Sequence, residues 1–567
     1  MSVPVRLGLA VLALGILLVG SAARAGTPAE EFVRLRDRYV ERLRPLEIEA
    51  GQAWWEASTT GSEAAYARRE QADNSMARMH ADAATFARLK ALRRSGALAD
   101  PILRRELEVM YRTFLPYQAD PELTRRIIAR EAEVDRLFNT HRSLVGGKRL
   151  TENDVRQILS TSSDSREVRE AWLGYMAVGR DVAGPLRDLV SLRNQVARKL
   201  GYRNYFQMKL DLQEFEEGEL VALFDDLDRL TRAPYQRLKA RIDAHRASRF
   251  GIPAEKLRPW HMGDLFFQEA PTLSNLSLDS LYEGKDPVRL SQAWMGSFGM
   301  EAGDIVARSD LYEREGKSPH AFETCIDRHQ DIRVLANVRP NASWMDTINH
   351  ELGHGVYDQY IGEDVPYLLH APAHVLTTEG IAMLFGQMSL NREFLERVVG
   401  VPAEKLEPAA RAAWENLRAE KLIFSRWTQV MFRFERALYE KPDQDLNRLW
   451  WALKKEYQLQ TPPEDLGGHD YGAKMHIVGA PVYYHNYMLG DLFAAQVQTY
   501  LARRVLHLEN PLDTSLEGRP EAGEFLKTRV FAPGALWDWR ELTRRVTGEP
   551  LSPKAFSELY LDPSDRP

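Results

Sequence analysis

The chain has 567 residues, of which 44% are apolar and 28% charged, a composition typical of a soluble globular protein with a large core. Its 81 acidic and 75 basic residues give a formal net charge of -6, with no basic stripe of the kind that binds phosphate backbones, so we expect no nucleic-acid partner. Cys325 is the single cysteine, which excludes an internal disulfide and is more typical of a buried thiol than of a nucleophile.

The first 25 residues have the pattern of a cleavable signal peptide. Arg6 precedes an apolar run from Leu7 to Gly20, and Ala23-Arg24-Ala25 suits a signal peptidase that cuts before Gly26. The run is shorter than the roughly 20 residues that span a bilayer, and no later segment is long and apolar enough to do so. We therefore expect export to a periplasm or to the medium, and a mature protein without a membrane span.

Helical periodicity dominates the rest of the chain. Apolar residues recur at three- and four-residue steps from Phe32 to Leu43 and again from Leu186 to Val196. The best strand candidate is Asp331–Val338, where Ile332 and Val334 share one face. Such a strand could be an edge that pairs with an extended peptide, or a strand of a small sheet without a ligand role. Because no linker or repeat interrupts residues 26–567, we expect one catalytic domain.

A metal-binding pattern, H-E-x-x-H, follows this strand at His350-Glu351-Leu352-Gly353-His354. Two histidines four residues apart lie on the same face of a helix, so both imidazoles can reach one ion. Glu351 projects from the same turn, where it can hold the metal-bound water. A catalytic zinc needs a third ligand, and Glu379, at the start of the next apolar helical pattern, is the natural donor. His370 and His374 are rival donors, and Glu379 could instead cap that helix.

This pattern predicts hydrolysis assisted by zinc. The ion lowers the pKa of water and polarises a carbonyl group, while Glu351 takes the proton and passes it to the leaving group. The tetrahedral intermediate also needs hydrogen-bond donors for its oxyanion. A downstream segment rich in polar and aromatic side chains could supply these donors or could serve only in packing: Lys474, His476, Tyr483, Tyr484, His485 and Tyr487.

Several blocks of the sequence resemble the angiotensin-converting-enzyme family of zinc peptidyl-dipeptidases, in its bacterial, single-domain form. Asp470–His476 is similar to the family's D-x-G-A-K-x-H block, and Leu446–Leu453, continuing to Pro463, is similar to the segment that precedes it. Weaker similarity at Trp54–Tyr66 and at Thr547–Ser552 extends the resemblance over nearly the whole mature chain. It implies a mainly α, two-lobed fold of the gluzincin type, with a deep central cleft and a small β element near the active site.

The resemblance also implies a role for individual residues. Three zinc ligands and the general base are implied: His350, His354, Glu379 and Glu351. Two residues would stabilise the intermediate: His476 and Tyr487. The remaining residues would bind the substrate near the scissile bond or at its terminal carboxylate: His320, Ala321, Lys474, Tyr484 and Gln268. A carboxylate bound at a fixed distance from zinc would measure off two residues, so that the enzyme releases dipeptides.

Three departures from the family pattern stand out. Tyr484-His485-Asn486-Tyr487 keeps the family's Y-x-x-Y spacing but lies one residue farther from His476, so Tyr483 rivals either tyrosine. Asn486 replaces an arginine that is tied to chloride activation in the animal enzymes, which leaves chloride dependence in doubt. Met383 replaces the carboxylate four residues beyond the third ligand, so the group that orients a zinc-bound imidazole must come from elsewhere.

The sequence therefore predicts an exported zinc peptidyl-dipeptidase, which acts on oligopeptides with a free C-terminus. A thimet-type oligopeptidase that cuts internal bonds is the first alternative, and Lys474 beside His476 argues against it. A non-catalytic peptide-binding protein is the second, and the presence of Glu351 argues against that. The sequence pattern specifies neither an oligomeric state nor a side-chain preference.

Overall fold

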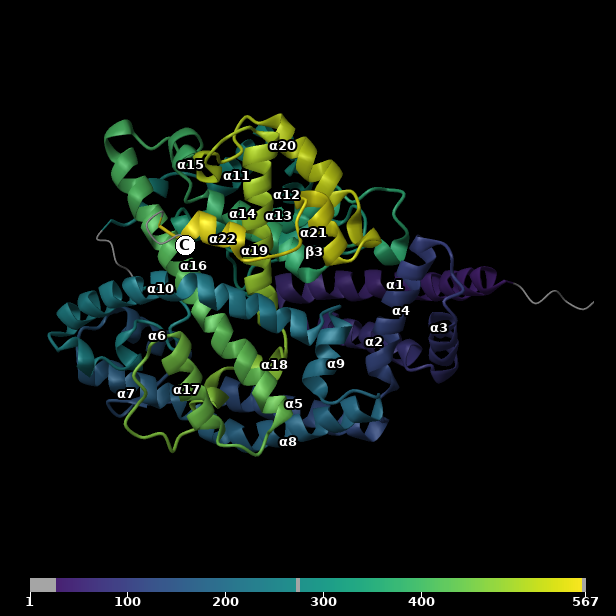
Figure 1. Ribbon diagram of the computed structural model, residues 1–567, viewed down its shortest axis with the longest axis horizontal. Helices are drawn as coiled ribbons and strands as arrows, with labels where there is room; N and C mark the ends of the chain where they lie inside the picture. Colours follow the sequence, from purple (N-terminus) through teal and green to yellow (C-terminus); the bar gives the residue numbers. More distant parts are fainter. Residues whose placement is uncertain (1–26, 272–275, 563–567) are drawn as a thin grey trace, which may run out of the picture.

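The computed structural model describes residues 27–271 and 276–562, and these residues are mainly helical (Figure 1). The described strands form two antiparallel pairs, β1 (Ser143–Val145) with β2 (Lys148–Leu150) and β3 (Phe322–Cys325) with β4 (Ile332–Leu335). The predicted mainly α fold with a small β element is therefore confirmed. The predicted signal peptide lies outside the described residues. Within the described ranges, no helix combines the length and apolar character that a bilayer span requires.

The N-terminal helices form a layer at one side of the molecule, on the right in Figure 1. α1 begins at a capping box, in which the side chain of Thr27 accepts from the amide of Glu30 and the Glu30 side chain accepts in return. Phe32 and Leu43, two of the residues with the predicted helical spacing, are buried against the neighbouring helices. The layer consists of α1 (Pro28–Thr60), α2 (Glu63–His80), α3 (Ala83–Ser95) and α4 (Pro101–Phe114).

A second set of helices fills the lower part of Figure 1 and is called the lower group here. Buried Arg193 on α8 links its parts, because the guanidinium donates to the carbonyl of Val478 at 2.8 Å and pairs with Glu131 at 2.6 Å. This contact ties the segment after Lys474 to the lower group. The group consists of α5 (Pro121–Thr140), α6 (Glu152–Thr161), α7 (Ser165–Met176), α8 (Val178–Lys199), α9 (Tyr205–Leu212), α17 (Leu446–Tyr457) and α18 (His476–Gly479).

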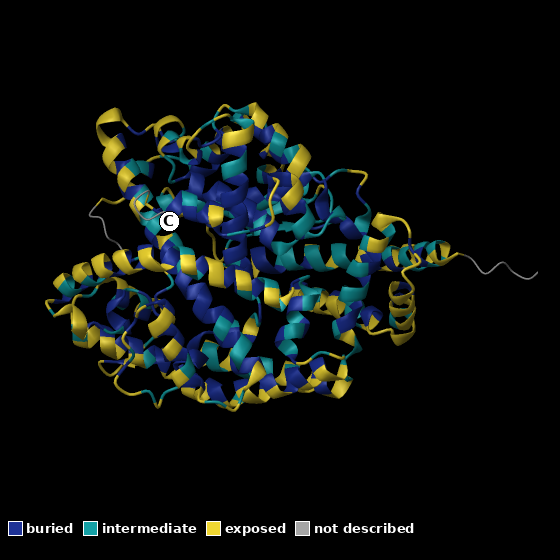
Figure 2. Ribbon diagram, in the orientation of Figure 1, coloured by how far each residue is buried: buried dark blue, intermediate teal, exposed yellow. Residues whose placement is uncertain are grey.

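The upper group of helices in Figure 1 holds the predicted metal-binding motif. α14 packs against both α13 and α19 there, in the densest concentration of buried residues (Figure 2). The group consists of α11 (Pro287–Ser297), α12 (Gly303–Arg308), α13 (Ala342–Gln359), α14 (Val375–Met388), α15 (Arg392–Arg397), α19 (His485–Tyr500), α20 (Pro520–Phe525), α21 (Trp539–Thr547) and α22 (Lys554–Tyr560).

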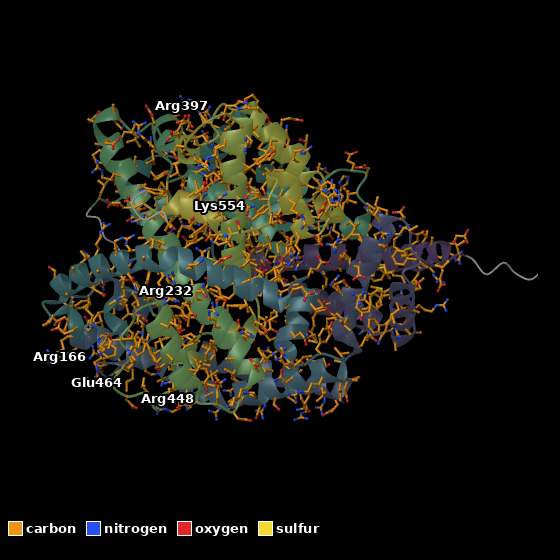
Figure 3. The ribbon with its side chains drawn as sticks, in the orientation of Figure 1. Arg166, Arg232, Arg397, Arg448, Glu464 and Lys554 are labelled. Carbon is orange, nitrogen blue, oxygen red and sulfur yellow. The ribbon has the colours of Figure 1, made fainter. Side chains whose placement is uncertain are left out.

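Two long helices join the groups. α10 (Glu217–Phe250) lies between them, and the 38-residue α16 (Ala403–Glu440) runs from the upper group into the lower one (Figure 1). One continuous cluster of buried apolar side chains includes Leu186 of the lower group and Phe385 of the upper group. Charged side chains such as Arg166, Arg397 and Arg448 are exposed and lie at the edges of the molecule in Figure 3. The two groups therefore share a core.

The β3–β4 hairpin confirms the predicted strand in the Asp331–Val338 segment. β4 spans Ile332–Leu335, and both Ile332 and Val334 are buried, as their shared face predicts. Glu323 of β3 pairs with Val334 of β4 in an antiparallel register. The sheet has these two strands among the described residues, and β3 packs beside α13. The hairpin therefore borders the metal-binding motif.

Candidate functional site

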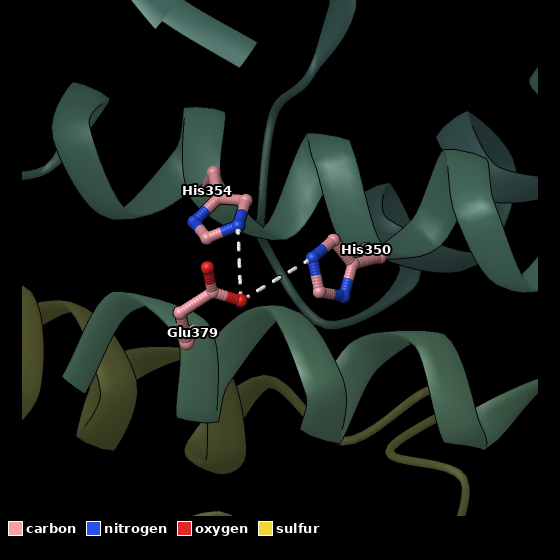
Figure 4. A group of neighbouring side chains, drawn as sticks. All are labelled: His350, His354 and Glu379. Atoms are coloured by element: carbon pink, nitrogen blue, oxygen red, sulfur yellow. Dashed lines mark ion pairs between the residues drawn. The ribbon is translucent and has the colours of Figure 1, made fainter. Parts of the chain in front are cut away.

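Two adjacent helices bring the predicted metal ligands together. α13 starts at Asn341, whose side-chain oxygen accepts from the Trp344 amide at 2.8 Å, and it presents both histidines on one face. Glu379 projects from α14 toward them (Figure 4). Oε2 of Glu379 lies 3.7 Å from Nε2 of His350 and 3.9 Å from Nε2 of His354. The three donor atoms all lie within 4.8 Å of one another, which is close enough for one ion to touch all three.

The placement of Glu379 depends on a close approach between α14 and α19. A Cβ atom added to Gly380 would lie 2.8 Å from the carbonyl oxygen of Gly490 and 2.8 Å from Cδ1 of Phe493. Only glycine lets the two backbones pack at this distance. The next residue back along α14, Glu379, is thereby fixed between α13 and α19.

The chemistry of this donor set fits zinc. Burial lowers the pKa of His350 to about 3, with a further contribution from His354 and Lys421, and burial lowers that of His354 to about 4. Both imidazoles are therefore neutral at physiological pH and have a nitrogen lone pair to offer. Two neutral histidines and one carboxylate form one of the ligand sets that catalytic zinc sites use.

Thr378 supplies the second contact that a metal-binding imidazole needs, a contact for which the sequence pattern offers no candidate. Its Oγ1 lies 2.6 Å from Nδ1 of His354, whose Nε2 faces Glu379. With Nε2 directed at the metal position, Nδ1 carries the proton and donates it to the threonine hydroxyl, which fixes the ring. The sequence feature that could have identified Thr378 is its position directly before Glu379 in the chain.

Glu351 lies beside this set with the properties of a general base. Burial raises the pKa of its carboxyl group to about 8, the charge of Glu379 adds to the shift, and a backbone hydrogen bond from Glu323 opposes it. A base whose pKa lies near neutrality can both accept and return a proton. The contact with Glu323 also places the carboxyl group next to strand β3.

A second set of polar side chains surrounds a buried ammonium group. Lys474 is 5% exposed, and its Nζ donates to Oε1 of Gln268 at 2.7 Å, while the hydroxyl of Tyr484 donates to the same oxygen at 3.4 Å. Burial lowers the pKa of Lys474 to about 8, against the opposing charge of Asp264. Among residues 27–271 and 276–562, no carboxylate forms a salt bridge with this ammonium. Such a group is stabilised by an anionic partner.

Gln268 is held in this set by the backbone before it. Its amide donates to Asp264 at 2.8 Å, and the preceding residue, Phe267, has a φ of 54°, in the left-handed region. Two side chains hold this segment, one on α17 and one directly after its C-terminus. Lys454 donates to the carbonyl of Phe266 at 2.8 Å, and Gln458 donates to that of Phe267 at 2.6 Å. The Gln268 side chain therefore has a fixed direction.

The aromatic cluster links the metal ligands to Lys474. The ring of Tyr484 lies 5.2 Å from the ring of His476 and 5.4 Å from that of Tyr487. Burial and then the charge of Glu379 raise the pKa of both Tyr483 and Tyr487, so both phenols lie near the metal ligands. Tyr484 thus belongs to the Lys474 side of the site, and the choice of oxyanion donor lies between the other two tyrosines.

The remaining sequence candidates occupy separate positions. His320 is exposed and Ala321 half-buried, and both directly precede β3 beside Glu351. His374 caps α14 and places Nε2 2.9 Å from the carbonyl of Gln213, whereas the ring of His370 lies 5.6 Å from that of His329. Neither rival histidine joins the metal group found among the described residues.

Two further sequence candidates can be placed. Burial raises the pKa of the Cys325 thiol, which disfavours the thiolate that a nucleophile requires. Asn486, at the position of the family's chloride-linked arginine, donates to Oε1 of Gln213 at 2.7 Å and to the carbonyl of Tyr483 at 2.9 Å. Its amide therefore makes neutral hydrogen bonds, and chloride dependence stays an open prediction.

Comparison with known proteins identifies the family. A family model described as angiotensin-converting enzyme matches residues 25–266 and 318–563, which include every predicted site residue except Gln268. The chain is 24% identical to the angiotensin-converting enzyme-like protein Ace3 of Mus musculus over 454 residues, covering 72% of this chain and 59% of the relative. It is 26% identical to thermostable carboxypeptidase 1 of Thermus thermophilus over 276 residues, 43% of this chain and 51% of the relative. The matches thus span only about half of each relative's length, and the chain belongs to the angiotensin-converting-enzyme family of peptidases.

Proposed function

We propose that this protein is a zinc peptidyl-dipeptidase, which removes dipeptides from the C-terminus of oligopeptides. The observation that carries the proposal is the buried Lys474, which has a polar partner in Gln268 but no carboxylate in a salt bridge within the described residues. A substrate's terminal carboxylate would complete this set. The aromatic cluster around Tyr484 connects it to the metal ligands, so the anchor and the hydrolytic groups act on one peptide.

His350, His354 and Glu379 would hold the zinc, which when bound supplies Lewis acidity that polarises the scissile carbonyl and acidifies water. Glu351 takes the proton of the attacking water and returns it to the leaving amine. His476, together with Tyr487 or its rival Tyr483, donates hydrogen bonds to the oxyanion.

The substrate lies along strand β3 in this proposal. β3 pairs with β4 along one edge, and the described sheet has no third strand, so its other edge can match the backbone of an extended peptide. His320 and Ala321 precede this edge and would contact the residues before the scissile bond. Lys474, Gln268 and Tyr484 would bind the carboxylate two residues beyond that bond.

One experiment tests metal, reaction and anchor together. An oligopeptide with a free C-terminus and its amidated copy are incubated with the zinc-loaded protein, with and without a chelator, and the products are identified by mass spectrometry. We expect successive dipeptides from the free peptide only, and no cleavage after chelation. Single released residues would favour a carboxypeptidase, the activity in the name of the Thermus relative. Internal cuts in both peptides would favour an oligopeptidase.

We also propose that the protein is exported, on the strength of the Arg6 and Leu7–Gly20 pattern at its N-terminus. Sequencing the N-terminus of the protein recovered outside the cytoplasm should find Gly26 first. Recovery of the full-length chain in the cytoplasm alone would overturn this proposal and would leave the catalytic one untouched.

A further inference from the structure

A cavity of about 470 Å³ opens beside the metal ligands, within the range of sizes typical of ligand-binding sites. It lies between the N-terminal half of α13, the C-terminal half of α14, the middle of α16 and α19. One zinc ligand forms part of its wall, so the cavity is continuous with the candidate active site. The lining residues include His350, Met383, Asp346, Glu420, Lys421 and Asp491.

The charges that line this cavity do not balance. Lys421 forms an ion pair with Asp491, and the two side chains are only 12% and 4% exposed. Asp346 and Glu420 face the same space, and the described residues provide neither of them with a hydrogen bond or an ion pair. Three carboxylates and one ammonium leave the cavity with a formal charge of -2. A cationic group is the complementary occupant.

The position of Asp346 is built into the helix packing. A Cβ atom added to Gly386 on α14 would lie 2.9 Å from Oδ1 of Asp346, so the glycine makes room for this carboxylate. Burial raises the pKa of Asp346 to about 6, against the attraction of Lys421, whereas Glu420 lines the same cavity from an exposed position on α16. Keeping Asp346 charged at this position therefore costs free energy, and a cation bound in the cavity would lower that cost.

The cavity adjoins the carboxylate anchor as well as the metal ligands. Phe424, which also lines it, lies one turn of α16 beyond Glu420, and its ring is 6.1 Å from the ring of Tyr484. The Tyr484 hydroxyl shares Oε1 of Gln268 with Lys474. A peptide whose last carboxylate binds Lys474 would therefore have its last side chain beside Phe424, at the edge of the cavity.

We propose that this cavity receives the side chain of the substrate's C-terminal residue and selects lysine or arginine. The inference rests on the proposed function, because it takes Lys474 as the carboxylate anchor. The cationic head would lie between Asp346 and Glu420, and the aliphatic stem would pack against Met383 and Phe424. An apolar side chain would leave Asp346 desolvated and neither carboxylate with a cation, and an acidic side chain would be repelled.

The test uses three peptides that differ only in the last residue: lysine, norleucine, which keeps the aliphatic stem, and glutamate. We expect kcat/KM for dipeptide release to be at least about tenfold higher with lysine than with norleucine, and lowest with glutamate. Glu420→Gln and Asp346→Asn should each lower the lysine-to-norleucine ratio about tenfold. Glu404→Gln, which removes an exposed carboxylate at the start of α16, should leave the ratio unchanged.

Calorimetric titration of the zinc-loaded protein with the product dipeptides Ala-Lys and Ala-norleucine separates this inference from the proposed function. Equal binding of the two dipeptides, an unchanged ratio in Glu420→Gln, or a preference for lysine at the penultimate position would each overturn the inference. Dipeptide release without a lysine preference would leave the proposed function intact. Lysine-selective binding that Glu420→Gln abolishes, without any dipeptide release, would support the subsite and overturn the proposed reaction.

Discussion

Replacement of Lys474 by methionine should stabilise the substrate-free protein and at the same time remove the proposed selectivity for a free C-terminus. Burial lowers the pKa of this ammonium from 10.5 to about 8, so keeping it charged costs about 3 kcal/mol in the folded state. Methionine matches the aliphatic stem of lysine in length, lacks the terminal ammonium, and avoids that cost. Loss of the hydrogen bond to Gln268 destabilises the variant by about 1 kcal/mol, so the free energy of unfolding should rise by about 2 kcal/mol in total.

The pH dependence of stability has a definite sign. Because the folded pKa lies below the unfolded one, the unfolded chain binds more protons between about pH 8 and pH 10.5. The contribution of Lys474 therefore makes the wild type more stable as the pH rises through this window, whereas below pH 8 the full cost remains. The Lys474→Met variant should lack this rise.

Two measurements check the prediction. Urea unfolding at pH 7 and at pH 10 gives the free energy difference, and kcat/KM for free and amidated peptides gives the selectivity. The variant should lose about 10²- to 10³-fold in kcat/KM for the free peptide only. Lys455→Met, at an exposed position on α17, serves as the control and should change neither quantity. A Lys474→Met protein that is less stable than the wild type, with its selectivity intact, would refute the reasoning.

Other substitutions test the metal site. Glu351→Gln should lower kcat at least about 10²-fold while metal analysis still finds stoichiometric zinc, and His350→Ala should lose both zinc and activity. Thr378→Val should weaken zinc binding about 10- to 100-fold in a chelator competition, and unchanged affinity would exclude its orienting role. Gly380→Ala should destabilise the fold by about 1–3 kcal/mol in urea, because its Cβ would meet the Gly490 carbonyl, and equal stability would contradict that contact.

The parts of the site that depend on local spacing could be predicted from the sequence. His350 and His354 are one helical turn apart, so any helix through the motif brings them together. Glu379 follows on the next long helix, which packs directly against the first. Lys474 and His476 could be predicted as functional candidates from their residue types, but their specific roles came from the family resemblance.

The parts that depend on distant contacts could not be predicted. Gln268 reaches Lys474 because Gln458, far along the chain, holds the carbonyl of Phe267 in a left-handed backbone conformation. No local pattern encodes that pairing. The acidic cavity likewise draws its carboxylates from three helices, so that Asp346 and Glu420, separated in sequence, become neighbours only after packing.

In the proposed reaction, the shared core of the two helix groups would set the length of the released product. Trp427 on α16 is fully buried, with its ring 5.7 Å from that of Phe266 and 6.0 Å from that of Tyr484. One residue of extended peptide spans about 3.3–3.6 Å. A change in the core that moved the carboxylate anchor by that distance relative to α13 would alter the register of cleavage, not merely its rate. In the proposed reaction, the register of cleavage would therefore depend on buried side chains of the shared core as well as on the residues that bind the peptide.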